Sequence, residues 1–145
     1  MTLPRRPLAI ELVVDTSALI AALLNEPTRD QILQVLQSKR GMSAISSASL
    51  LESAMVMASR KGPHGLDLLD EFVNAADIVA MPIDTQQLIL AREAWLRFGR
   101  GNHPAQLNFG DCFSYALAAH CDVALLCTGN DFAQTDLSMA LGKVA

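Results

Sequence analysis

Three carboxylates stand alone in apolar segments of this sequence. Asp15 is the only charged residue in LVVDTSALIAALL, and Asp111 is the only one in LNFGDCFSYALAAH. In ASLLESAMVMASRK, Glu52 is the only charged residue before Arg60 and Lys61 at the end of the stretch. Apolar surroundings disfavour an isolated ionised carboxylate, so acids that occupy such positions are candidates for binding or catalysis.

A fourth candidate lies in the GND tripeptide near the C-terminal end. Asp131 follows the apolar run VALLCT, which reads as a buried strand ending just before Thr128. GND is also common turn chemistry, and Asn130 offers an amide oxygen beside the carboxylate of Asp131. Either side chain, or neither, could therefore take part in the site.

If these acids lie close together in the folded protein, their negative charges repel one another. Two ionised carboxylates about 4 Å apart repel by roughly 4 kcal/mol at an effective dielectric constant of 20. A cluster of three or four must therefore bind protons or a cation. Oxygen-only ligation favours Mg²⁺ or Mn²⁺, and Mg²⁺ commonly completes its coordination with waters and substrate phosphate. The pattern therefore indicates chemistry on phosphodiesters.

Each acid also has a purely structural interpretation. Asp15 could initiate a helix, although Thr16 and Ser17 could serve that purpose as well. Glu52 could face solvent on its helix, but its neighbours leave little polar face there. Asp111 could simply stabilise the first turn of a helix through the helix dipole.

Strands and helices alternate along the chain. Hydrophobic periodicity and cap residues predict strands at 10–14, 42–45, 78–81 and 123–127, and helices at 18–24, 29–40, 48–61, 66–76, 84–99 and 109–120. Gly62, Pro63 and Gly65 are expected to separate two of these helices. The alternation predicts one domain over residues 1–145, an α/β fold of three layers with helices on both faces of a mainly parallel sheet. Asp15 and Asp131 would then follow carboxyl ends of strands, where such sheets bind ligands.

Composition limits the class of protein. The chain of 145 residues is 51% hydrophobic and carries a formal charge of −4, which disfavours both disorder and nonspecific coating of nucleic acid. No apolar run is long enough to span a membrane, and no signal peptide is evident. Three cysteines without a CxxC pair fit reduced thiols. We expect a cytoplasmic protein.

Four segments together resemble a known family. VVDTSALIAALLNEP, SSASLLESAMVMASR, GRGNHPAQLNFGDCFSYALAA and LLCTGNDFAQTDL are similar to the PIN-domain ribonucleases, specifically the VapC-type toxins of bacterial toxin–antitoxin pairs. The resemblance extends over almost the whole chain, and HPAQLNFGDCFSYALA is its most specific part. It implies a PIN-like fold and a divalent-metal-dependent endoribonuclease that cleaves RNA, with tRNA or rRNA as the expected substrate.

The resemblance also implies roles for individual residues. Its motif acids correspond to Asp15, Glu52 and Asp111, with a fourth position at Asn130 or Asp131, as ligands of Mg²⁺ or Mn²⁺. Many relatives carry an aspartate where Asn130 stands, so the fourth ligand stays open between these two residues. Hydroxyl groups that could orient the carboxylates belong to Thr16, Ser17 and Thr128.

Partners follow from the same resemblance. It implies a VapB-like antitoxin that covers the acids, with the apolar faces of ALIAALL and SLLESAMVMAS as groove walls, and a homodimer formed through other helical faces. Local basic side chains, including Arg92, Arg97 and Arg100, would supply RNA affinity, although solvated helix ends are the simpler explanation of them. The aromatic residues Trp95 and Phe109 are expected to pack on helix faces.

Two other functions compete with this one. A catalytically weak PIN-like module that binds RNA or protein would not need the three acids. A phosphatase with Asp15 as covalent nucleophile would favour a second aspartate two residues later, where Ser17 stands.

Overall fold

Four parallel strands form the centre of the molecule. The computed structural model describes residues 9–142 and places strands β1 (Leu12–Val14), β2 (Ser43–Ser46), β3 (Ile78–Met81) and β4 (Ala124–Leu126) in the order β3-β2-β1-β4. Every pairing is parallel, with Leu12 opposite both Ser43 and Ala124. The chain therefore adds β2 and β3 on one side of β1 and later returns to place β4 on the other side.

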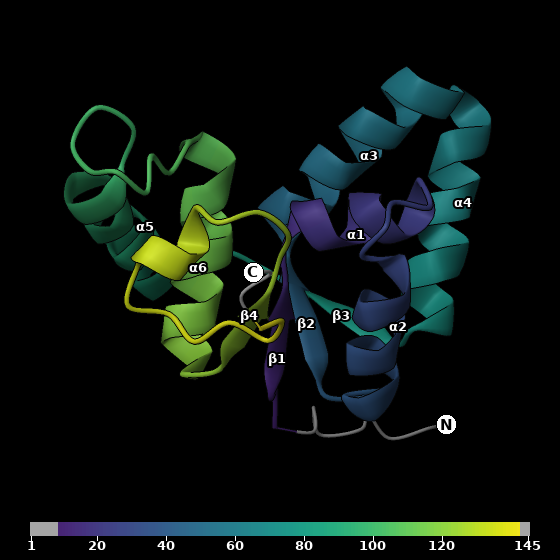
Figure 1. Ribbon diagram of the computed structural model, residues 1–145, viewed down its shortest axis with the longest axis horizontal. Coiled ribbons are helices and arrows are strands. Elements are labelled where there is room, and N and C mark those ends of the chain that lie inside the picture. The colour runs from purple at the N-terminus through teal and green to yellow at the C-terminus, as the bar shows by residue number, and fades with distance from the viewer. Residues whose placement is uncertain (1–8, 143–145) are drawn as a thin grey trace.

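Helices cover both faces of the sheet (Figure 1). They are α1 (Thr16–Leu23), α2 (Arg29–Ser38), α3 (Ser47–Lys61), α4 (Pro63–Ala75), α5 (Thr85–Phe98) and α6 (Phe109–Cys121), followed by the short 3₁₀ helix η1 (Phe132–Gln134). Helices α5 and α6 lie together on one side, and α1 to α4 lie on the other (Figure 1). The expected three-layer α/β architecture with a parallel sheet is confirmed.

Alternation along the strands divides the core in two. Val13 and Leu125 point toward α5 and α6, whereas Leu12, Val14 and Leu126 point toward α1 to α4. All five side chains are buried. Because successive residues of a strand face opposite sides of the sheet, a short apolar run supplies both cores at once.

Several helix ends follow from the cap residues. The side chain of Asp84 accepts a hydrogen bond from the Gln87 amide and begins α5, and Asn108 begins α6 in the same way. Strands 10–14 and 123–127 were predicted too long, since the structure pairs only Leu12–Val14 and Ala124–Leu126.

The break expected at Gly62, Pro63 and Gly65 is partly wrong. Pro63 is the first residue of α4, a position where its missing N–H costs nothing, and Gly65 lies inside this helix. A Cβ on Gly65 would lie 2.2 Å from the Met57 carbonyl oxygen of α3. Glycine therefore permits the close packing of α3 on α4 and does not end a helix.

The two helical faces expected to line an antitoxin groove differ in exposure. At the C-terminal end of α1, Ile20, Leu23 and Leu24 are half-buried, whereas Leu51 and Met55 on α3 are 62% and 65% exposed. Trp95 and Phe109 do not pack fully on helix faces, because they remain 42% and 79% exposed. Within residues 9–142, no helix is both long and apolar enough to cross a membrane.

Candidate active site

Asp15 lies at the carboxyl end of β1, where the strand order changes direction. Its neighbours β2 and β4 leave β1 on opposite sides, and ligands of parallel sheets bind at such a point. The Asp15 carboxylate is only 4% exposed and also caps α1. One of its oxygens, Oδ2, accepts hydrogen bonds from the Ser17 amide at 3.0 Å and the Ser17 hydroxyl at 2.6 Å.

Buried serines hold the other oxygen of Asp15. The Ser114 hydroxyl on α6 donates to Asp15 Oδ1 at 2.5 Å and lies 3.0 Å from the Ser49 hydroxyl on α3. Because the single proton of Ser114 is directed at Asp15, Ser49 must be the donor of the pair. Ser17 of α1 and Ser114 of α6 therefore fix the carboxylate directly, and Ser49 of α3 supports Ser114.

Asp111 lies in the first turn of α6 and caps its own helix. Its carboxylate accepts a hydrogen bond from the Asn108 amide at 3.0 Å, and the Asn108 side chain accepts one from the Asp111 amide at 2.9 Å. Burial raises the pKa of Asp111 to about 6, against the lowering effect of the Asn108 amide. The charges of Asp15, Asp131 and Glu52 also raise the pKa of Asp111.

Glu52 on α3 reaches the first turn of α6 beside Asp111. A Cβ built on Gly110 would lie 2.5 Å from Glu52 Oε2 and 3.0 Å from Oε1. The half-buried carboxylate of Glu52 therefore rests directly on the Gly110 backbone. Glycine leaves the space that this approach requires.

Asp131 and Asn130 point to different surroundings. Asp131 is exposed and precedes η1, and its charge contributes to the raised pKa of Asp111. Asn130 lines a separate pocket with Cys127, Gly129 and Met139.

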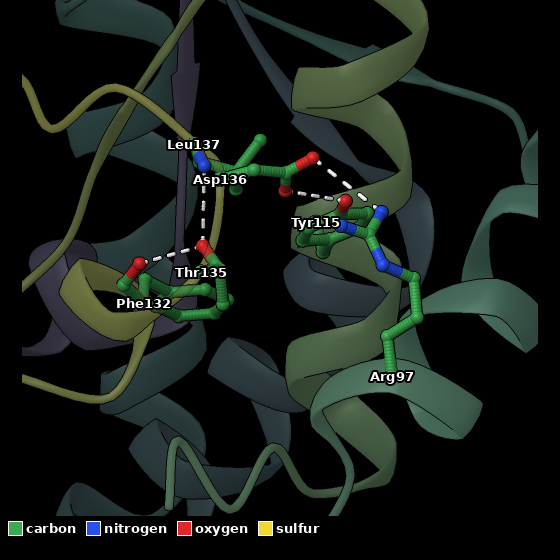
Figure 2. Close-up of polar contacts among 6 residues, drawn as sticks. All are labelled: Arg97, Tyr115, Phe132, Thr135, Asp136 and Leu137. Atoms are coloured by element: carbon green, nitrogen blue, oxygen red, sulfur yellow. Dashed lines mark hydrogen bonds and ion pairs between the residues drawn. The ribbon is translucent and has the colours of Figure 1, made fainter. Parts of the chain in front are cut away.

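The segment after Asp131 is tied to the body of the protein by polar contacts (Figure 2). Tyr115 of α6 donates a hydrogen bond to Asp136, and Arg97 of α5 forms an ion pair with the same carboxylate. The Thr135 hydroxyl donates to the Phe132 carbonyl and accepts from the Leu137 amide. Phe132 itself is buried in the core beside α6.

Three hydroxyl residues, Thr16, Ser17 and Thr128, were expected to orient the carboxylates, and of their side chains Ser17 alone donates to one of the acids. Ser17 bonds to Asp15 and also accepts a hydrogen bond from the Thr128 amide at 3.0 Å, which links the ends of β1 and β4. The Thr16 hydroxyl donates instead to the Ser49 carbonyl. Thr16 therefore fixes α1 to α3 and does not touch an acid.

The donor set suits a hard divalent cation. Carboxylates surround Asp111 closely enough to raise its pKa, and a cation would relieve that repulsion. Within residues 9–142, no three acidic, histidine or cysteine side chains are arranged so that they could hold a metal ion by themselves. Mg²⁺ commonly takes one or two protein carboxylates and completes its shell with waters and phosphate.

Sequence inspection did not identify Ser114, Ser49 and Gly110 as parts of the site. Ser114 lies three residues after Asp111, so both side chains lie on the same face of α6. The sequence could have indicated Ser114, because it is the single serine of this apolar helix and lies on the same face as Asp111. No sequence pattern indicates Ser49 or Gly110, because their roles depend on how α3 crosses α6.

Asp15 lies at the switch point of a short parallel sheet, and similarity to known proteins identifies the class of fold. The PIN domain family model matches residues 12–137. The chain belongs to the PIN-domain family, and the resemblance found in the sequence is confirmed. It is 42% identical over 133 residues to ribonuclease VapC28 of Mycobacterium tuberculosis, covering 91% of this chain and 99% of that protein.

Other relatives and solved structures point the same way. Identity to a ribonuclease VapC of Mycolicibacterium smegmatis is 41% over 127 residues, covering 88% of this chain and 98% of that protein. The fold matches the sarcin-ricin-loop-cleaving toxin VapC20 of M. tuberculosis with a TM-score of 0.72 at 16% identity, covering 88% of this chain and 96% of VapC20. It matches DNA-bound VapBC from Salmonella typhimurium with a TM-score of 0.73 at 17% identity, covering 90% and 96%.

Proposed function

We propose that this protein is a divalent-metal-dependent endoribonuclease, the toxin of a toxin–antitoxin pair. The observation that carries the proposal is the Asp15 carboxylate at the end of β1, which Ser17 and Ser114 hold in place and which lies beside the helix that carries Asp111. Relatives that match almost the whole chain are named VapC ribonucleases, which supports RNA as the substrate. The expected cofactor is Mg²⁺ or Mn²⁺.

The chain's own residues position the reacting groups. Asp15 and Asp111 are the principal proposed metal ligands, with Glu52 and Asp131 at the edges of the site and Asn130 outside it. A bound divalent ion supplies Lewis-acid stabilisation of phosphate charge and lowers the pKa of water. Ser17 and Ser114 keep both oxygens of Asp15 in fixed orientation, so little reorganisation is needed on binding.

The proposed biological setting is the bacterial cytoplasm, with a VapB-like antitoxin as partner and a homodimer as the working assembly. The structures named VapBC support the antitoxin. On α3, the exposed residues Leu51 and Met55 flank Glu52, so a segment lying there would also cover the acids.

Cleavage assays with matched variants test the activity. Antitoxin-free protein is incubated with total RNA, then with purified tRNA and rRNA, in Mg²⁺, Mn²⁺ or EDTA. Asp111→Asn is compared with Asp122→Asn, the same substitution at the other end of α6. Asp122 is exposed and its backbone has the left-handed helical conformation. Asparagine tolerates that conformation, so the control should fold normally.

The expected result is metal-dependent cleavage by the wild type and by Asp122→Asn, with a loss of at least about 100-fold in folded Asp111→Asn. Equal activity in all three proteins would overturn the assignment of the site. RNA binding without cleavage under any metal condition would favour the alternative, a PIN-like binding module. A phosphatase would instead trap a beryllofluoride phosphoaspartate mimic on Asp15.

A further inference from the structure

The two outer edges of the sheet are protected differently. Beside β4, the segment that follows η1 bonds to the strand: the Leu125 amide donates to the Ser138 carbonyl and the Ala140 amide donates to the Leu125 carbonyl, both at 2.9 Å. Strand β3 lies at the opposite edge (Figure 1). It pairs with β2 on one side and, within residues 9–142, with no strand on the other. One edge of the sheet is therefore covered and the other is open.

The open edge presents backbone groups that lack a partner strand. The Met81 carbonyl accepts a hydrogen bond of 3.0 Å from the hydroxyl of Ser47, which directly follows β2, so the backbone of Met81 faces β2. Because the N–H and C=O groups of successive residues in a strand point to alternate sides, those of Ile78 and Ala80 point away from β2. Ala80 is exposed, and in the described part of the chain no backbone group outside the β2–β3 pair bonds to either residue.

Apolar side chains accompany these backbone groups. Val79 shares a sheet face with Met81, the face that α5 and α6 cover, yet Val79 is 41% exposed. The two helices therefore do not extend over β3. The strand IVAM has no charged residue, no proline and no bulge, which are the devices that commonly prevent an edge strand from pairing with another chain. Pro82 follows the strand directly, so an added segment is restricted to a few residues.

The chain around this edge is acidic. Residues 62–91, which include α4, β3 and the start of α5, contain five acidic residues and no lysine or arginine. All five are exposed: Asp67, Asp70, Glu71, Asp77 and Asp84. Asp77 directly precedes β3 and Asp84 follows it by three residues, so a carboxylate lies beyond each end of the strand. Arg40 donates to the Ala75 carbonyl at the end of α4 and offsets part of this charge.

We propose that the β3 edge binds an extended segment of another protein, apolar in its middle and basic at its ends, which adds to the sheet as a further strand. Main-chain hydrogen bonds to Ile78 and Ala80 hold this segment, and its basic ends lie near the acids that flank β3. A second copy of this chain fits the edge less well, because pairing of β3 with itself brings two acidic segments together. The charge around the strand therefore selects a basic partner.

Synthetic peptides test this pairing directly. The probe is a fluorescein-labelled octapeptide with lysine at both ends and alternating threonine and valine between them. One control peptide is N-methylated at four successive internal residues, which blocks both of its edges, and another has glutamate in place of lysine. Fluorescence anisotropy should show saturable binding of the probe, weakened at least about tenfold by N-methylation and about fivefold by glutamate. In NMR, hydrogen exchange of the Ala80 amide should slow on binding, whereas that of Val79, which already faces β2, should not change.

Two aspartates provide a matched pair of variants. Asp77 and Asp122 are both exposed, have φ values of 55° and 54°, and lie between a helix and the strand that follows it. Asparagine tolerates this left-handed conformation. Asp77→Asn should weaken binding of the probe about twofold, and Asp122→Asn should leave it unchanged.

Ala80→Pro tests the backbone contact from the side of the protein. It removes the N–H group that points outward, at an edge position where strands tolerate proline, and should weaken binding at least about tenfold. Circular dichroism and urea unfolding verify that this variant is folded. Asp77→Asn provides a second variant that keeps the strand intact.

The outcomes are independent of the proposed function, because neither RNA nor metal is present. Failure of the probe to bind saturably, or equal binding of the N-methylated peptide, would overturn strand addition at β3. Equal binding of the glutamate peptide would overturn the basic character of the partner. A wild-type dimer that becomes a monomer in Ala80→Pro, without binding of the probe, would identify a second copy as the occupant and also overturn the inference. Slowed exchange at Ala80 with the probe would support it even if the protein cleaved no RNA.

Discussion

The phenol of Tyr115 donates a hydrogen bond of 2.6 Å to Asp136, which also lies 3.5 Å from the Arg97 guanidinium (Figure 2). Tyr115 is one helical turn after Asp111, and Asp136 is five residues after Asp131. The contact therefore fixes the loop that carries one acid to the helix that carries another.

This contact should be visible in the titration of Tyr115. Burial, then the hydrogen bond to Asp136, raises the pKa of Tyr115 to about 12. The unfolded pKa is about 10, so the contact stabilises the fold fully below pH 10, and this stabilisation is lost as pH rises through 12. Tyr115 is the only tyrosine, so absorbance at 295 nm follows it alone.

Asp136→Asn provides the control for this titration. The midpoint should fall, because a neutral amide no longer repels the phenolate, but it should stay above that of the urea-unfolded protein since burial persists. Far-UV circular dichroism must show that the protein is folded over the range compared. A wild-type midpoint equal to that of the unfolded chain would show that the hydrogen bond does not form.

The two side chains of the GND turn should differ in their effect on metal binding. Asp131→Asn should weaken Mn²⁺ binding by about tenfold, because it removes a charge that acts on Asp111. Asn130→Ala should leave it unchanged, since Asn130 lines the pocket beside Met139. Isothermal titration calorimetry with Mn²⁺ decides between them, and the reverse order of effects would assign the fourth position to Asn130.

Local sequence signals were sufficient for most of the fold. The helices predicted at 84–99 and 109–120 begin within one residue of the observed starts of α5 and α6, and the strand at Ile78–Met81 has the predicted ends. The failures came from contacts between elements far apart in sequence. Gly65 was expected to break a helix, because the sequence does not show that this residue packs against the Met57 carbonyl of another helix.

In the candidate site, too, local features could be predicted from the sequence and contacts between distant elements could not. Isolated acids in apolar segments could be recognised in the sequence, because an unpaired charge there has few structural explanations. Their supporting groups could not, since Ser49 and Ser114 are ordinary small residues until α3 packs on α6 and brings their hydroxyls within 3.0 Å. Pairing across 65 residues of sequence leaves no local pattern.

Loss of the Ser114 hydroxyl should impair the site more than the fold. Ser114→Ala removes the donor to Asp15 Oδ1 and should weaken Mn²⁺ binding and RNA cleavage by about 10- to 100-fold. Ser53→Ala is the matched control, because Ser53 is equally buried but donates only to the Ser49 carbonyl. Urea unfolding should show a similar cost of about 1 kcal/mol for both variants. Equal activity of the two would mean that Ser114 does not orient Asp15.

Two glycines inside helices should respond to alanine in opposite ways. In Gly110→Ala the new Cβ meets the end of the flexible Glu52 side chain, which can move away, so the fold survives and α6 gains up to about 1 kcal/mol of helix propensity. The displaced carboxylate should lower cleavage by about tenfold.

In Gly65→Ala the Cβ meets the Met57 backbone, which cannot move aside, and the free energy of unfolding should fall by about 1–3 kcal/mol. Urea denaturation and single-turnover cleavage of the folded variants measure both effects. Full activity in Gly110→Ala would show that Glu52 is not required where the structure places it.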